Sequence, residues 1–391
     1  ITYIGYSLLY LGLMLILFDK GSRFGKLKVM LDKIKMRKHK LSGAIPILLF
    51  ALLSYSGFAQ NDDPEHGHVR TSKAQVDSIV NAMKVTPEHA AKFGKLVIQD
   101  AGGRMKPANT FSSELLRKLS KSDTYEDLNA DQVLLSMTEN PALWYNAPII
   151  YIKPGNDSIR HITGVEEGQK YMAMTDFFDR TGTYKLSPHL EKAYQAAVPN
   201  QFQKDFIEAD RKVNLLFYAL QGEMLRIFPI PGDENNKWVS YADVPESNFK
   251  GMDSVYARQI LPIYMNSLRD ARKTGDYTQA DELAGSIASF QKKFGSEVMP
   301  SEQKLEAEIL YNKYDIFRNL FMLYMLAGLI MLVFVIIQIF KDSKLIRYLI
   351  NGSAILILLF FVLHTLGIAV SWFISVHSPW SDSYVLSLLP I

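Results

Sequence analysis

Four apolar stretches constrain this chain more than any other feature of its sequence. The longest runs over residues 348–376, where only His364, Thr365, Gly367 and Ser371 interrupt the apolar residues between Ala354 and Trp372. A helix needs ~20 apolar residues to cross the ~30 Å hydrocarbon core of a bilayer, so this stretch is predicted to be a transmembrane helix. Three further spans are predicted, over residues 1–18, 41–59 and 316–340.

Two basic segments orient these spans. Residues 19–40 hold nine Lys and Arg residues against two Asp residues, and residues 341–347 hold Lys341, Lys344 and Arg347. Short loops rich in Lys and Arg stay on the cytoplasmic side, so both segments are predicted to be cytoplasmic loops. A basic amphipathic surface helix is an alternative for 19–40 and lies on the same side. Segment 41–59 can be an internal anchor or a cleaved signal sequence, and either one sends the following residues across the membrane.

The polar middle, residues 60–315, is therefore predicted to be a large extracytoplasmic domain, followed at the far end by an extracytoplasmic segment over 377–391. The whole is predicted to be a mainly α membrane protein, with four transmembrane helices and a mostly helical domain that contains a minor β element. A net charge of +3 gives no indication of nucleic-acid binding. The absence of cysteine excludes disulfides, thiolate metal sites and cysteine nucleophiles.

Local signals within the domain predict its elements. Thr86 and Pro87 are typical of a helix start, residues 95–100 of a short strand, and Gly102 and Gly103 of a tight turn that needs positive φ. Asn109 or Thr110 is predicted to cap the next helix. The remaining predictions are a hairpin pairing 148–152 with 159–163, helices over 205–228, 252–273, 277–294 and 301–314, and short strands or loop at 227–231 and 237–239. The last helix is predicted to continue into the third span without a break.

Recognisable catalytic motifs are missing from this sequence: it has no HExxH motif and no carboxylate pair at diagnostic spacing. His89, His161 and His189 are isolated, and each is more typical of a core or surface residue than of a ligand. His364 differs because it lies near the middle of a predicted span, where a polar side chain is costly without a partner or a function.

The two ends of the chain resemble a known family. The stretch from Tyr3 to Gly12 with the basic region at Arg23 resembles the final transmembrane helix of a ResB protein of cytochrome c maturation. Phe361–Gly367, Trp372 and the stretch from His377 to Tyr384 resemble the first helix of CcsA and its exit loop. Phe93–Phe111 resembles the extracytoplasmic domain of fused ResB–CcsA proteins of the Bacteroidetes kind. Two positions depart from the pattern, since Asp382 stands where Asn is usual and Val385 where Glu is expected.

This resemblance implies a component of cytochrome c maturation in the inner membrane, with its large domain in the periplasm. It implies haem delivery and attachment to apocytochrome c at the outer face of the membrane, with haem as the cofactor. His364, His377 and Trp380 are the candidate haem-binding residues, and no catalytic residue can be carried over. The expected partners are haem, apocytochrome c, the lipid bilayer and the remaining ResB and CcsA parts of the same protein. The tryptophan-rich haem-handling segment of CcsA would follow Ile391 and the earlier ResB helices would precede Ile1, so the chain is expected to be an internal fragment.

Three alternatives remain open at this point. A transporter is the weakest, because four spans with one buried histidine offer little pathway. The chain can instead be a membrane-anchored extracytoplasmic binding or sensor module without catalytic activity, since no motif in it requires chemistry. His364 can likewise be a packing residue that bonds to a neighbouring helix rather than an axial haem ligand.

Overall fold

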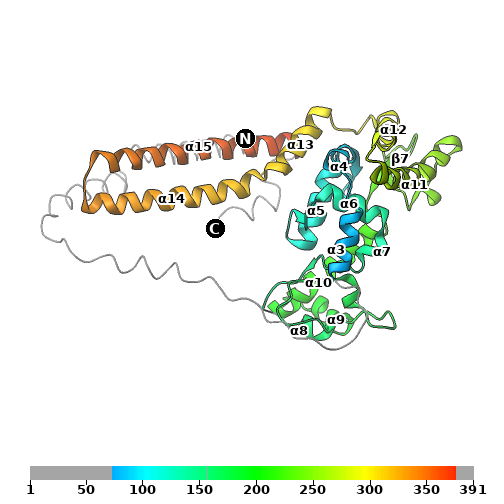
Figure 1. Ribbon diagram of the computed structural model, residues 1–391, viewed down its shortest axis with the longest axis horizontal. Helices are drawn as coiled ribbons and strands as arrows, with labels where there is room; N and C mark the ends of the chain where they lie inside the picture. The colour runs from blue at the N-terminus through cyan, green and yellow to red at the C-terminus, as the bar shows by residue number, and fades with distance from the viewer. Residues whose placement is uncertain (1–72, 156, 376–391) are drawn as a thin grey trace. The chain divides into compact units, whose positions relative to one another are not determined.

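The computed structural model describes residues 73–155 and 157–375 (Figure 1). Two compact units divide the described chain: residues 318–364 form one, and residues up to 317 together with 365–375 form the other. The predictions for residues 1–18, 19–40, 41–59 and 377–391 lie outside the described residues. The described part is mostly helical with a minor β component, as the sequence predicts.

The domain begins with helices that form around one apolar core. In α4 (Pro87–Gly94), the Thr86 side chain accepts a hydrogen bond from the His89 backbone N–H, which confirms the predicted helix start. Asn129 and Gln132 form a reciprocal capping box at the start of α6 (Ala130–Glu139). The other elements of this part are α3 (Lys73–Ala82), α5 (Ala108–Ser120), α7 (Pro141–Trp144) and the short pair β3 (Thr124–Tyr125) and β4 (Leu128–Asn129).

A β-hairpin separates α4 from α5. Strands β1 (Val97–Gln99) and β2 (Met105–Pro107) pair antiparallel, and Gly103 at the turn has φ +83°, which confirms the predicted glycine turn. The predicted cap of the following helix was wrong: α5 begins at Ala108, directly after Pro107, and neither Asn109 nor Thr110 caps it. Their side chains serve tertiary contacts instead, because Asn109 donates to Asp131 and Thr110 donates to Glu308.

The predicted pairing of 148–152 with 159–163 was wrong in its second half. Strand β5 (Ile150–Tyr151) pairs with β6 (Tyr171–Met172), whereas Ser158–Thr163 forms helix α8. The fully buried Arg160 side chain explains this arrangement, since its Nη2 donates to the Ile152 carbonyl and its Nε to the Gln169 carbonyl, at 3.1 and 2.7 Å. Arg160 therefore holds together the end of the β5–β6 pair at which the connecting segment leaves β5 and enters β6, which the sequence pattern did not indicate.

Helices and a second hairpin complete the domain. Strands β7 (Arg226–Pro229) and β8 (Trp238–Ser240) pair antiparallel, which confirms the strand alternative for these segments. The predicted helices at 252–273, 277–294 and 301–314 are present as α11 (Gly251–Thr274), α12 (Thr278–Gly295) and α13 (Glu302–Tyr314). Helix α10 ends earlier than predicted, at Leu220. The remaining elements are η1 (Met174–Phe177), α9 (Ser187–Gln195), α10 (Gln201–Leu220) and η2 (Val244–Glu246).

Helix α13 is attached to this domain by polar contacts. The Glu308 carboxylate, buried at 4 % exposure, accepts from Arg104 Nη2 at 2.7 Å and from the Thr110 hydroxyl at 2.9 Å. Asn312 Nδ2 donates to the same hydroxyl at 2.8 Å. A small apolar cluster of Val97, Trp238 and Leu305 lies beside these contacts. The base of α13 is therefore fixed through both charge and packing.

The predicted unbroken continuation of α13 into the third span was wrong. Asp315 adopts a left-handed conformation with φ +39°, and it separates α13 from α14 (Ile316–Phe340). Short polar residues such as Asp tolerate this conformation better than others, so a single Asp can end one helix and begin the next.

Two long apolar helices follow. At ~1.5 Å per residue, α14 is ~37 Å long and α15 (Lys344–Ser375) ~48 Å, enough to cross a bilayer. By length and composition both helices qualify as membrane spans. They run antiparallel on either side of residues 341–343 (Figure 1), where Ser343 Oγ accepts from the Ile346 backbone N–H and Arg347 pairs with Asp342 at 3.0 Å.

Candidate functional site

His364 is the one predicted site residue that the described chain contains; His377 and Trp380 lie outside the described residues. It lies on α15 and is half-buried. Its ring centroid is 6.3 Å from that of Tyr324 on α14, with the ring planes tilted by 58°. The Tyr324 ring also meets Phe360 edge-on at 5.7 Å. These three rings form a contact between the paired helices, and we call them the aromatic contact.

The aromatic contact belongs to a stripe of less exposed positions on each helix. On α14 these positions include Leu320, Tyr324, Ala327 and Met331, and on α15 they include Ile346, Ile350, Ser353, Ile357, Phe360 and His364. Their spacing alternates between three and four residues, as in a coiled-coil seam. The outward residues are almost all apolar and well exposed, as lipid-facing side chains are. The polar His364 therefore lies on the stripe that faces protein.

The fit of haem to His364 is partial. A neutral imidazole on a half-exposed helix position is a suitable axial ligand for iron, and the neighbouring Tyr324 and Phe360 rings offer flat apolar surface. However, the two pockets described below are both lined by residues of the large domain, and neither includes His364. The described residues therefore offer haem one imidazole with two aromatic rings beside it.

Metal-binding clusters are absent from residues 73–155 and 157–375, where no three His, Cys, Asp or Glu side chains lie close enough to hold an ion. His161 is exposed and pairs with Glu167, and the His189 ring packs on Phe206 at 5.2 Å. Both have the surface or packing roles that the sequence predicts.

His89 is different from the other domain histidines because it is the centre of a buried polar chain. Its Nδ1 lies 2.7 Å from Asp281 Oδ1, and its Nε2 lies 2.7 Å from the Tyr264 hydroxyl. Burial lowers the pKa of His89, although the neighbouring Asp281 opposes that shift. A neutral ring that donates from Nδ1 and accepts at Nε2 satisfies both neighbours.

The order carboxylate–imidazole–hydroxyl is that of a proton relay that runs inward from the surface. Asp281 at its outer end has a side chain 28 % exposed and also pairs with Lys92. His89 is 1 % exposed and Tyr264 at the inner end is fully buried, so the three side chains tie α4, α11 and α12 together. The residues are separated by 175 and 192 positions in sequence, so no local motif could reveal them.

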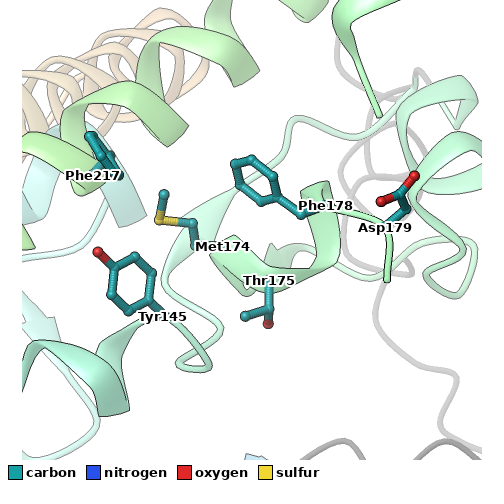
Figure 2. Close-up of a pocket in the computed structure, with 6 residues that line it drawn as sticks. All are labelled: Tyr145, Met174, Thr175, Phe178, Asp179 and Phe217. Carbon is teal, nitrogen blue, oxygen red and sulfur yellow. The ribbon is translucent and has the colours of Figure 1, made fainter. Parts of the chain in front are cut away.

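An open pocket of about 320 Å³ lies elsewhere in the domain (Figure 2). Tyr145, Phe178 and Phe217 give it aromatic walls and Met174 lines it as well, while Thr175 and Asp179 are the polar lining residues. These residues follow α7, lie in or after η1, or belong to α10. None was singled out from the sequence as a site residue, because aromatic and methionine residues scattered over positions 145–217 form no recognisable motif. A second, much smaller pocket lies at Tyr151 and Lys212.

Comparison with known proteins gives a similarity that extends over nearly the whole chain. No family model matches the chain. The chain is similar to Protein NrfI of Wolinella succinogenes, with 32 % identity over 390 residues. That alignment covers 98 % of this chain and 40 % of NrfI, so the chain spans about two fifths of the length of this relative.

Proposed function

We propose that this chain is part of a cytochrome c maturation protein that delivers haem and supports its attachment to apocytochrome c at the outer face of the membrane. The observation that carries the proposal is the similarity to Protein NrfI over nearly the whole chain, which supports a place in cytochrome c biogenesis. The resemblance of the two ends to ResB and CcsA agrees with it. The remaining ResB and CcsA parts, apocytochrome c and haem are the proposed partners.

The proposed location is the inner membrane, with the domain over 60–315 in the periplasm. Support comes from the two long apolar helices and from the basic turn between them. Because residues 1–391 contain no cysteine, a single cysteine introduced among them reports its own location without background from this segment. Glu166→Cys, on an exposed loop of the domain, should react with a membrane-impermeant maleimide in intact cells. Lys344→Cys, at the first residue of α15 and in the predicted cytoplasmic turn, should react only after the cells are opened. The reverse pattern would overturn the proposed topology.

We propose His364, with His377 and Trp380, as the residues of this chain that contact haem. The substrate haem supplies vinyl groups, to which the thiols of an apocytochrome CxxCH motif add, so the chain needs no cysteine of its own. The residue whose surroundings are described, His364, is held against Tyr324 on the stripe that faces α14. Its role would be to offer a neutral ring nitrogen from a fixed helical position.

The test is a comparison of His364→Ala with Ser353→Ala in the full-length protein. Ser353 lies on the same stripe of α15, and its hydroxyl donates to the Leu349 carbonyl of its own helix. We expect His364→Ala to lower both the haem Soret absorbance of the purified protein and the cytochrome c yield in cells, with Ser353→Ala near the parent. Unchanged values in both assays would reduce His364 to a packing residue.

A membrane-anchored binding or sensor module is the second candidate. It is favoured by the aromatic pocket in the large domain. Deleting the gene separates the two candidates. Cells that keep normal haem-stained cytochromes c without it would favour the module, whereas loss of those cytochromes supports the maturation function.

A further inference from the structure

Gly367 is the position of the α15 stripe that follows His364, and it is buried. A Cβ added to it would lie 3.3 Å from Ile316 Cγ2 and 3.4 Å from Phe317 Cε1. Both side chains belong to the first turn of α14, directly after the break at Asp315. Small residues in membrane helices allow a neighbouring helix to approach closely. The glycine therefore lets the first turn of α14 pack directly on α15.

Phe317 is held by a second contact, so it cannot easily give way. Its ring meets the Tyr311 ring of α13 edge-on, with the centroids 6.1 Å apart. Helix α13 is in turn attached to the domain through Glu308, which accepts from Arg104 and Thr110. A larger side chain at position 367 would therefore push α15 away from the first turn of α14, because the opposing ring is braced by α13.

His364 lies one helical turn from Gly367 on the same face of α15, ~4.5 Å away along the helix axis. Its ring is 6.3 Å from that of Tyr324, and rings interact at centroid distances of ~4.5–7 Å. A separation of the two helices by more than ~1 Å at this level would therefore end the contact. The close spacing that Gly367 permits is thus the spacing that the contact of His364 with Tyr324 requires.

We propose that Gly367 is the positioning residue for His364, because its missing side chain keeps α15 close enough to α14 for the imidazole to rest beside Tyr324. The inference rests on the proposed contact of His364 with haem and adds the residue that orients the ring. An axial ligand has to direct one ring nitrogen at the iron. A ring that is already held in one orientation loses less conformational entropy when it binds, so Gly367 favours haem binding without touching haem itself.

A chemical probe of His364 tests this positioning without haem. Diethyl pyrocarbonate adds to an accessible imidazole nitrogen, and mass spectrometry after proteolysis gives the rate of this reaction at each histidine. In the full-length protein in detergent, we expect Gly367→Leu to raise the rate at His364 several-fold relative to the exposed His161. Gly352→Leu is the matched control on α15. Position 352 is exposed and an added Cβ would have nothing within 4 Å, so the rate at His364 should stay at the parent value.

Removing the opposing ring should reverse the effect. Phe317→Ala, added to Gly367→Leu, makes room for the new side chain, so His364 should return to the parental rate. General damage to the protein would not be repaired in this way. The haem Soret absorbance of the purified protein should follow the same order, lost in Gly367→Leu and regained in the double variant.

The possible outcomes separate this inference from the proposed haem contact. A parental rate at His364 in Gly367→Leu, an equal rise in Gly352→Leu, or no recovery in the double variant would each overturn the positioning role. If His364→Ala keeps the parental Soret absorbance while the reaction rates behave as expected, the haem contact fails and the positioning of His364 by Gly367 stands.

Discussion

Gly295, the last residue of α12, lies where no side chain fits. A Cβ at this position would be 2.3 Å from Trp238 Cζ2, and 3.0 and 3.2 Å from two further atoms of the same ring. Carbon atoms normally contact at ~3.5–4.0 Å, so Gly295→Ala creates an overlap of more than ~1 Å. The Trp238 ring cannot easily move aside, because it is 1 % exposed and the Trp238 backbone N–H donates to Gln99 Oε1 at 2.8 Å.

The size of the effect follows from two opposing terms. Overpacking a core costs ~1–3 kcal/mol or more, and an overlap this large belongs at the upper end, ~3 kcal/mol. Replacing Gly by Ala in a helix returns up to ~1 kcal/mol. The free energy of unfolding should therefore fall by ~2 kcal/mol, which lowers the melting temperature of a domain of this size by ~4–8 °C.

The matched control lies in the same helix. A methyl group added at Gly285 would have nothing within 4 Å, and the residue is exposed, so Gly285→Ala gains helix propensity alone. It should raise the free energy of unfolding by ~0.5–1 kcal/mol. Thermal unfolding of the full-length protein in detergent, followed by tryptophan fluorescence, measures both variants. If Gly295→Ala melts at or above the parent temperature, the close approach of α12 to Trp238 is refuted.

Two further predictions concern stability. The lowered pKa of His89 means that the folded domain prefers the neutral ring; this stabilisation is complete above the unfolded value of 6.5 and is lost as the pH falls through the folded value. The melting temperature should therefore drop between pH 7.5 and pH 5. A His89→Gln variant, whatever its own stability, should show a smaller change in melting temperature over this pH range. An equal change in both proteins would contradict this role of His89. Arg160→Met leaves the buried Ile152 carbonyl and the Gln169 carbonyl without their donor and Asp157 without its ion-pair partner, and should cost ~3 kcal/mol in a denaturant titration. Arg258→Met at an exposed position should change stability by less than ~0.5 kcal/mol.

The sequence predicted those parts of the fold that depend on local chemistry. The Thr86–Pro87 start of α4, the Gly103 turn and the long amphipathic helices are each set by neighbouring residues, and they are confirmed. The errors occurred where a distant contact decided the outcome. Arg160, in the helix over 158–163, donates to carbonyls that follow β5 and precede β6, and helix signals within these residues are weak.

The candidate sites also differ in whether a local signal or a distant contact defines them. His364 was proposed as a site residue because a histidine within a run of apolar residues can be recognised from the sequence itself. The aromatic pocket was not, since Tyr145, Phe178 and Phe217 are ordinary residues until the fold brings them to one surface. The buried contact of His89 with Tyr264 and Asp281 likewise joins three helices that are far apart in the chain.

For the proposed membrane location, the position of His364 on the stripe that faces α14 has a consequence for biosynthesis. During synthesis α14 emerges first, and none of its residues from Leu320 to Ile337 is charged, so it can enter the lipid alone. Helix α15 would present its imidazole to lipid until it meets Tyr324. Insertion of α15 should therefore be easiest beside an α14 already in place, with the three residues 341–343 keeping the two helices together. In this order of assembly, α14 provides the contact that the polar side chain of α15 needs within the membrane.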